Sequence, residues 1–134
     1  MERVVKISFI IFSLLCFCPF PSFGAEFPNV EVVQEIKQPE PSDCIETFSI
    51  PYDKLYYLTL AATNEFNYQI REIQTKNGYI IFETGYRKYL ASIVYVSSGK
   101  SMLKITPYSG NYDFPIAVPQ SVFKYIEQNK DKTY

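Results

Sequence analysis

The sequence contains no histidine and no tryptophan among its 134 residues. Without histidine the chain cannot form Ser-His or Cys-His catalytic pairs, histidine-bearing metal sites, or the proton shuttle that most often works near neutral pH. Neither a GxGxxG nor a GxxxxGK[ST] segment occurs, so nothing in the sequence indicates nucleotide chemistry. We therefore expect a protein that is not an enzyme and that uses no cofactor or metal ion.

The chain also lacks a strong net charge, because 13 basic residues stand against 14 acidic ones. Nucleic acids and anionic membranes are bound through a dense positive field, which this composition does not supply. What the chain has in abundance is tyrosine, with 12 residues, all of them after residue 51. The composition favours a protein partner or self-association over nucleic acid.

The first 24 residues have the pattern of an export signal. A basic end, MERVVK, precedes the apolar stretch ISFIIFSLLCFC, and PFPSFG follows with prolines and small residues. Ser22 and Gly24 stand where a signal peptidase requires small side chains, so we expect cleavage after Gly24. The apolar stretch is too short for a membrane span, which needs about 20 apolar residues. The mature protein is expected in the periplasm or outside the cell, without a membrane span; a retained signal that acts as an anchor is the alternative.

Only three cysteines are present, and cleavage would remove Cys16 and Cys18. The remaining Cys44 cannot form an internal disulfide. It is expected to be either a buried inert thiol or a handle for an intermolecular bridge. Because its neighbours Asp43 and Glu46 are acidic, they favour the inert thiol over an activated one.

The rest of the chain divides into a leader and one domain. Residues 25–43 are expected to form an extended leader, because KQPEPSD is rich in proline and charge. The domain is expected to span residues 44–130. It begins with a strand in CIETFSI, and apolar residues spaced by three and four then predict a helix over about residues 51–65. PQSVFKYIEQNK predicts a closing helix.

Three turns predict four antiparallel strands between these helices. Asn77-Gly78 predicts a two-residue type I′ turn, and Ser98-Gly99 predicts another two-residue turn. A three-residue loop at 85–87 makes the faces agree across all four strands, and a shift of one residue would move every side chain to the opposite face. The predicted fold is a two-layer α+β domain in the order strand, helix, four antiparallel strands, helix, with both helices on one sheet face.

The two faces of the predicted sheet differ in character. The face under the helices is aliphatic and consists of Ile73, Ile80, Phe82, Leu90, Val94, Leu103 and Ile105. The open face is rich in tyrosine and consists of Tyr79, Ile81, Tyr89, Ile93, Tyr95, Met102 and Tyr108. Large exposed apolar patches tend to mark interaction sites, and tyrosine suits them because it buries much area with few rotatable bonds. The open face is therefore the candidate partner surface, unless the leader folds over it or it is a tolerated exterior.

Two carboxylates on the open face are predicted to lie side by side, since the Asn77-Gly78 turn sets Glu72 opposite Glu83. Adjacent like charges raise the pKa of one partner, which is a route to acid and base catalysis or to cation binding. The simpler expectation is that Arg71, Arg87 or Lys104 neutralises the pair.

The segment IPYDKLYYLTLAATNEFNYQIREIQTKNGYIIFET carries a resemblance. An amphipathic helix followed by FNYQI and NGYII resembles small bacterial envelope domains of the TBP-like or helix-grip type, such as those in the outer-membrane assembly lipoprotein BamC. The likeness covers residues 45–128 and implies a fold and an envelope location. No lipid-attachment cysteine follows the signal here, so it implies neither outer-membrane anchoring nor any binding residue.

The sequence thus favours a small exported, non-catalytic protein that binds another envelope or secreted protein through its tyrosine-rich face. One alternative is a glycan-binding module, or a minor carbohydrate-active enzyme, that uses the tyrosines as platforms and Glu72 and Glu83 as polar contacts. The other alternative is a homodimer without a ligand.

Overall fold

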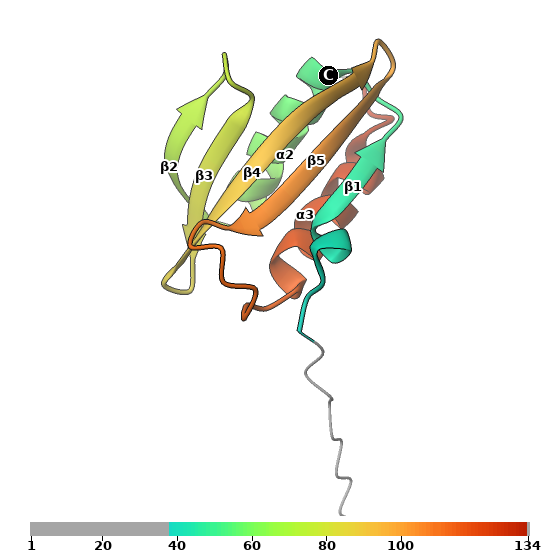
Figure 1. Ribbon diagram of the computed structural model, residues 1–134. Coiled ribbons are helices and arrows are strands. Elements are labelled where there is room, and N and C mark those ends of the chain that lie inside the picture. Colours follow the sequence, from blue (N-terminus) through green and yellow to red (C-terminus); the bar gives the residue numbers. More distant parts are fainter. Residues whose placement is uncertain (1–37, 134) are drawn as a thin grey trace, which may run out of the picture. The chain divides into compact units, whose positions relative to one another are not determined.

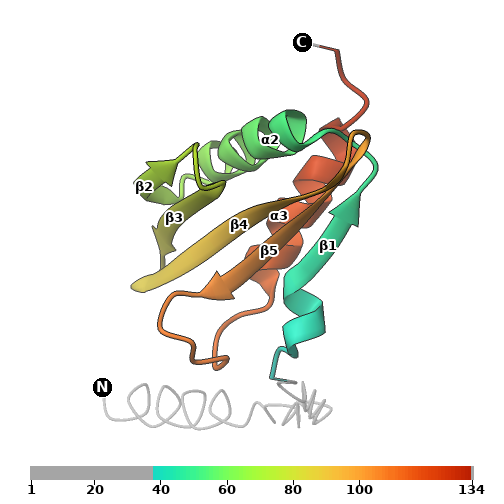
Figure 2. The same ribbon diagram turned by 45° about the horizontal axis from the view of Figure 1, so that its top comes forward.

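A computed structural model of the chain describes residues 38–133. In this part of the chain, five strands form one open antiparallel sheet, and two α-helices pack on a single face of it (Figure 1). Figure 2 shows the same two layers after a 45° turn. The predicted fold class is confirmed: the order is strand, helix, four antiparallel strands, helix. The predicted signal peptide and the leader up to residue 37 lie outside the described residues.

The elements follow the chain in a simple order. They are the 3-10 helix η1 (Pro41–Cys44), β1 (Ile45–Phe48), α2 (Tyr52–Glu65), β2 (Gln69–Gln74), β3 (Tyr79–Thr84), β4 (Arg87–Ser97), β5 (Lys100–Pro107) and α3 (Ala117–Asn129). In the sheet the strands are arranged as β1-β5-β4-β3-β2. β1 and β2 are therefore its two edges.

Helix α2 forms where the apolar spacing predicts it. Pro51 precedes its first residue in an extended conformation, and Asp53 in the first turn complements the helix dipole. The buried residues of the helix are Leu55, Tyr56, Leu58, Thr59, Ala62 and Thr63. The helix ends before Asn67, whose φ of 54° is left-handed and cannot continue a right-handed helix. α2 thus packs on the sheet through its apolar stripe.

The core between the sheet and the helices contains a row of aromatic rings. Tyr68 stacks on Phe82, and Phe82 stacks on Tyr89, each with ring centroids 5.3 Å apart. Tyr89 in turn meets Phe114 edge to face at 5.8 Å. Such ring pairs add to the free energy gained from burial alone. The row ties β3 and β4 to the segment that leads into α3.

The turn between β3 and β4 differs from the predicted three-residue loop. It contains two residues, because Thr84 pairs with Arg87. Gly85 and Tyr86 both have positive φ, 56° and 68°, as a type I′ turn requires. Tyrosine is uncommon at positive φ, which is why the sequence alone favours a longer loop. The shorter turn shifts β4 by one residue and reverses its faces.

The turn between β4 and β5 is the predicted pair Ser98-Gly99, but the strands beyond it are displaced. Ser97 pairs with Lys100, whereas Tyr95 pairs with Ser101, so Val96 forms a β-bulge between them. The bulge shifts the register by one residue and reverses the faces a second time. The two shifts cancel for β5, so only β4 has its faces opposite to the prediction.

The turn between β2 and β3 spans residues 75–78 rather than Asn77-Gly78 alone. Gln74 pairs with Tyr79, and only Gly78 of the predicted pair has a positive φ. Gly78 also extends the pairing of β3 with β4, because the N–H of Ile93 donates a 2.8 Å hydrogen bond to its carbonyl. The longer turn separates residues that a type I′ turn would have paired.

Candidate interaction surface

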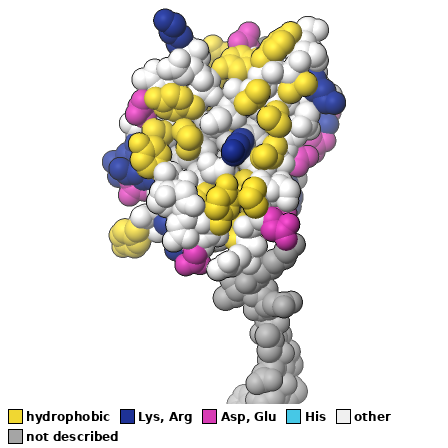
Figure 3. All heavy atoms as spheres, viewed as in Figure 1, with side chains coloured by type: hydrophobic (Ala, Val, Ile, Leu, Met, Phe, Trp, Pro, Cys, Tyr) yellow, Lys and Arg dark blue, Asp and Glu magenta, His cyan; other side chains and the backbone are white. Residues whose placement is uncertain are grey.

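The sheet face opposite the helices carries a group of apolar side chains, and no described helix lies on it (Figure 1, Figure 3). We call this group the open-face cluster. Its members are Ile45, Tyr79, Ile81, Leu90, Val94, Met102 and Tyr108. Strand pairing sets Ile81 beside Leu90 and Val94 beside Met102, and the Ser92–Lys104 pair lies between these two apolar pairs. Figure 3 shows hydrophobic side chains over much of this face and charged ones chiefly toward its margin.

Four of the seven predicted surface residues belong to this cluster. Tyr79, Ile81 and Met102 project from the open face, and Tyr108 continues it where its N–H bonds to the carbonyl of Lys88, 2.8 Å away. Of these, Tyr108 is well exposed, Tyr79 and Met102 are half-buried, and Ile81 is nearly buried among its neighbours.

The other three predicted surface residues lie elsewhere. Placing Tyr89 and Ile93 on the open face was wrong: they are only 1% and 5% exposed and form part of the core under the helices. Tyr95 is exposed, but it pairs with Ser101 on the helix side of the sheet, near the end of β4. The reversed faces of β4 explain all three, and they bring Leu90 and Val94 to the open face in exchange.

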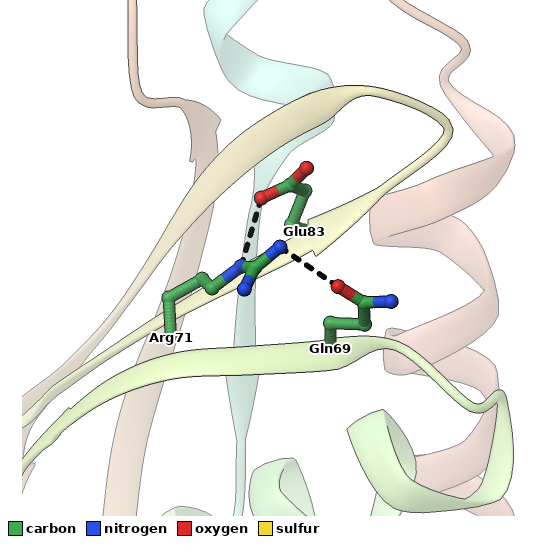
Figure 4. A network of polar contacts seen from close by, with 3 residues as sticks. All are labelled: Gln69, Arg71 and Glu83. Atoms are coloured by element: carbon green, nitrogen blue, oxygen red, sulfur yellow. Dashed lines mark hydrogen bonds and ion pairs between the residues drawn. The ribbon is translucent and has the colours of Figure 1, made fainter.

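The predicted carboxylate pair does not form. Glu72 lies opposite Ile81, and Glu83 lies opposite Gln69, because the β2–β3 turn is longer than predicted and β2 has a bulge at Arg71. Each carboxylate has its own partner. The Glu83 carboxylate accepts a 2.9 Å hydrogen bond from Nε of Arg71 (Figure 4). Arg71 is one of the three cations that were expected to neutralise the carboxylates.

Glu72 instead binds a tyrosine of the open-face cluster. Its Oε1 accepts a 2.7 Å hydrogen bond from the Tyr79 hydroxyl and a 3.1 Å bond from Nε2 of Gln74. The bond to Glu72 raises the pKa of Tyr79, because it stabilises the protonated hydroxyl. Tyr79 is thereby held as a hydrogen-bond donor with a fixed orientation on the open face.

Lys104 is the charged residue that lies within the cluster. It is exposed, and its cross-strand neighbours are Ser92 on β4 and Ile45 on β1. Along β5 the residues on the same face are Met102 and Thr106, so these four neighbours are uncharged. Among the residues that the structure describes, Lys104 takes part in no ion pair. The surface therefore combines an apolar area with one available ammonium group.

Cys44 is buried at the end of η1 and is not a surface handle. Its Sγ lies 3.7 Å from the carbonyl of Glu40, to which it donates a weak hydrogen bond. Burial and the neighbouring Asp43 raise the pKa of the thiol, and Lys104 opposes them. This environment is that of an inert structural thiol.

The helix side of the domain has a feature that the sequence analysis missed. An apolar hollow of about 690 Å³ lies along α2 and α3 and is lined by Lys54, Tyr57, Leu58, Ala61, Tyr125, Lys132 and Thr133. The signal for it is Tyr57, a large aromatic side chain on the solvent side of the α2 stripe.

Comparison with known proteins gives no family. No protein-family model matches the chain, and no curated protein matches it. Within residues 38–133, no group of acidic, cysteine or histidine side chains is placed to hold a metal ion. The described helices include none with the length and apolar character that a membrane crossing requires.

Proposed function

We propose that this protein is a small exported, non-catalytic binding protein that docks another protein on the open face of its sheet. The observation that carries the proposal is the open-face cluster, seven apolar or aromatic side chains on four adjacent strands with no described helix over them. Scattered exposed apolar residues are normal on a protein surface, but apolar side chains that gather on one open sheet face are typical of a site of interaction.

The chemistry of the surface indicates which kind of protein surface would bind to it. Tyr79, Tyr108 and Met102 are residue types enriched where proteins meet, because they bury large or adaptable apolar surface. Lys104 stands among them and forms no ion pair within the described residues. A docking protein should present an apolar patch with one carboxylate placed to meet this ammonium. An ion pair enclosed by apolar contacts fixes the register of the two surfaces, and an unmatched partner would leave the charge buried and unpaired.

Export is the second part of the proposal, and it rests on the residues of the N-terminal segment. The basic end, apolar stretch and small residues before Gly24 are those of a secretory signal. The resemblance of residues 45–128 to small envelope domains of the TBP-like or helix-grip type points to the same compartment. The proposed partner is therefore an envelope or secreted protein.

Acidic substitutions on the open face test the proposal. Chemical cross-linking in the producing cells should join the wild-type chain to a discrete second protein. Val94→Glu and Lys104→Glu change exposed side chains of the open face, so the fold should be retained and the adduct should disappear. Lys124→Glu makes the same charge change as Lys104→Glu, but at an exposed position of α3, and should leave the adduct unchanged.

Other results would identify another function. An adduct that persists in Val94→Glu and Lys104→Glu would reject the open face as the docking surface. An adduct of two copies of this chain that disappears in Val94→Glu and Lys104→Glu would show that the face joins two copies. Specific hits on a glycan array that are lost in Tyr79→Ser would instead support a carbohydrate-binding module.

A further inference from the structure

Strand β2 is an edge of the sheet that no described element covers. Every residue from Gln69 to Ile73 is exposed, and Ile70 and Ile73 leave 39% and 46% of their surface in contact with solvent. An edge strand also presents main-chain N–H and C=O groups that can pair with another strand. Both properties make β2 a place where a further strand can add to the sheet.

The sequence of β2 is complementary to itself when it is read in the opposite direction. It is Gln-Ile-Arg-Glu-Ile-Gln, a palindrome in which Arg71 and Glu72 change places. Two copies of β2 that pair antiparallel around a two-fold axis between these residues set Gln69 opposite Gln74 and Ile70 opposite Ile73. They also set Arg71 opposite Glu72, and each pair occurs twice because of the symmetry. Opposite charges and apolar residues that face each other across strands stabilise pairing.

The bulge in β2 makes this register consistent with the faces of the sheet. In a regular strand Arg71 and Glu72 would point to opposite faces, and opposite residues of a pair must share a face. Here the strand shifts between Ile70 and Glu72. The Arg71 side chain reaches Glu83 and Gln69 on the open face, at 2.9 and 2.8 Å (Figure 4).

Glu72 lies on the same face, where its Oε1 meets the Tyr79 hydroxyl. Ile70 and Ile73 lie opposite Phe82 and Ile80, which belong to the helix side. The two charged residues are therefore on one face and the two isoleucines are on the other. In the two-fold arrangement each residue meets its complement on the same face.

We propose that two copies of this chain associate through their β2 edges and form one continuous ten-stranded antiparallel sheet. The helices of both copies lie on one side of this sheet, and the two open faces form a single larger surface on the other. Arg71 reaches Glu72 of the second copy, while Ile70 and Ile73 bury their exposed surface against each other. The contact is isologous and closes with two copies.

This association does not depend on the proposed function, but it would strengthen binding if the proposed function is correct. A partner that binds one open face would find a second face fixed beside it, which increases the avidity for an oligomeric or repetitive partner. The association requires only the purified chain, whereas the proposed function requires a second protein. If the test of the dimer fails, the proposed function still stands, and if the test of the proposed function fails, the dimer still stands.

Sedimentation velocity of the purified full chain over a range of concentrations tests the proposal. Arg71→Glu places two glutamates opposite each other, and Glu72→Arg places two arginines opposite each other, so each variant should weaken the dimer about tenfold or more. When the two variants are mixed, both charge pairs become attractive again and a heterodimer should form. The double variant Arg71→Glu/Glu72→Arg should recover a homodimer.

Matched controls separate this effect from a general effect of charge. Lys76→Glu repeats the charge change in the turn that follows β2, and Glu65→Arg repeats the opposite change at the end of α2. Both should dimerise as the wild type does, and circular dichroism should show the same fold in all variants. A wild-type chain that is monomeric at all concentrations would show that the bulge and charges protect the edge instead. A dimer that survives both single reversals, or a mixture that forms no heterodimer, would also overturn the proposal.

Discussion

The hydroxyl of Tyr52, in the first turn of α2, lies directly against Gly78 in the β2–β3 turn, where any added side chain would collide with it. Gly78 also has a φ of 69°, and the Ile93 carbonyl would be 3.0 Å from an added Cβ. Gly78→Ala should therefore destabilise the domain by roughly 2 to 4 kcal/mol, since strained backbone and overpacking each cost about 1 kcal/mol or more. Urea denaturation measures this loss.

Two controls separate the collision from the backbone strain. Gly85 has a φ of 56° but no atom within 4 Å of an added Cβ, so Gly85→Ala should cost only the strain, about 1 kcal/mol. Tyr52→Phe removes the colliding hydroxyl and should recover part of the loss in the Gly78→Ala background. Equal losses for the two alanine variants would refute the predicted collision.

The faces of β4 provide the second prediction. Ile93 pairs with Leu103 inside the core, and its neighbour Val94 is 41% exposed on the open face. Ile93→Ala should lower the free energy of unfolding by about 2 to 5 kcal/mol, because it removes buried surface and leaves a cavity. Val94→Ala should lower it by less than about 1 kcal/mol. If denaturation curves gave the reverse order, the register of β4 described above would be incorrect.

The third prediction concerns alkaline pH. Burial raises the pKa of Tyr89 and of Tyr68 above the value near 10 that tyrosine has in an unfolded chain. Above pH 10 the unfolded chain releases these protons while the folded protein retains them. Stability that is fully present below pH 10 should therefore be lost as the pH rises through the pKa of the folded state.

Tyr89→Phe keeps the ring stack and removes one group whose pKa is raised by burial. It should reduce the loss of unfolding free energy above pH 10 by up to about 1.4 kcal/mol per pH unit. Urea titrations at pH 9, 10 and 11 give the comparison, and identical slopes for wild type and Tyr89→Phe would argue against a buried, titrating Tyr89.

The fourth prediction is that Cys44 resists thiol reagents in the folded protein. Its side chain is fully buried and its pKa is raised, so little thiolate is available for reaction. Iodoacetamide labelling mapped by peptide mass spectrometry should find Cys44 unmodified in native buffer and modified in urea. Rapid modification of Cys44 in native buffer would mean that η1 opens easily.

The sequence was sufficient for the elements but not for every face. The three-and-four spacing predicted α2, and Ser98-Gly99 predicted the β4–β5 turn, because each signal is local. In β5 the alternation of Met102, Lys104 and Thr106 with Leu103 and Ile105 assigned the faces correctly.

β4 offered a weaker signal: Lys88 and Ser92 fall in one phase of the alternation, but Leu90, Val94 and Val96 in the same phase are apolar. Its faces depend on a tyrosine at positive φ in one turn and on a bulge at Val96 near the other. Neither feature is visible in the periodicity. Two compensating shifts left β5 correct and reversed only β4, so Tyr89 and Ile93 were exchanged with Leu90 and Val94 at the candidate site.

Site-specific photo-cross-linking tests most directly whether the open face binds another protein. A benzoyl-phenylalanine at Val94 places the reactive group in the open-face cluster, and the same residue at Tyr57 places it on the helix side. After irradiation of the producing cells, we predict a discrete adduct with a second protein from Val94, none from Tyr57, and its loss when Lys104→Glu is added. No adduct from Val94, or the same adduct from both positions, would contradict the account.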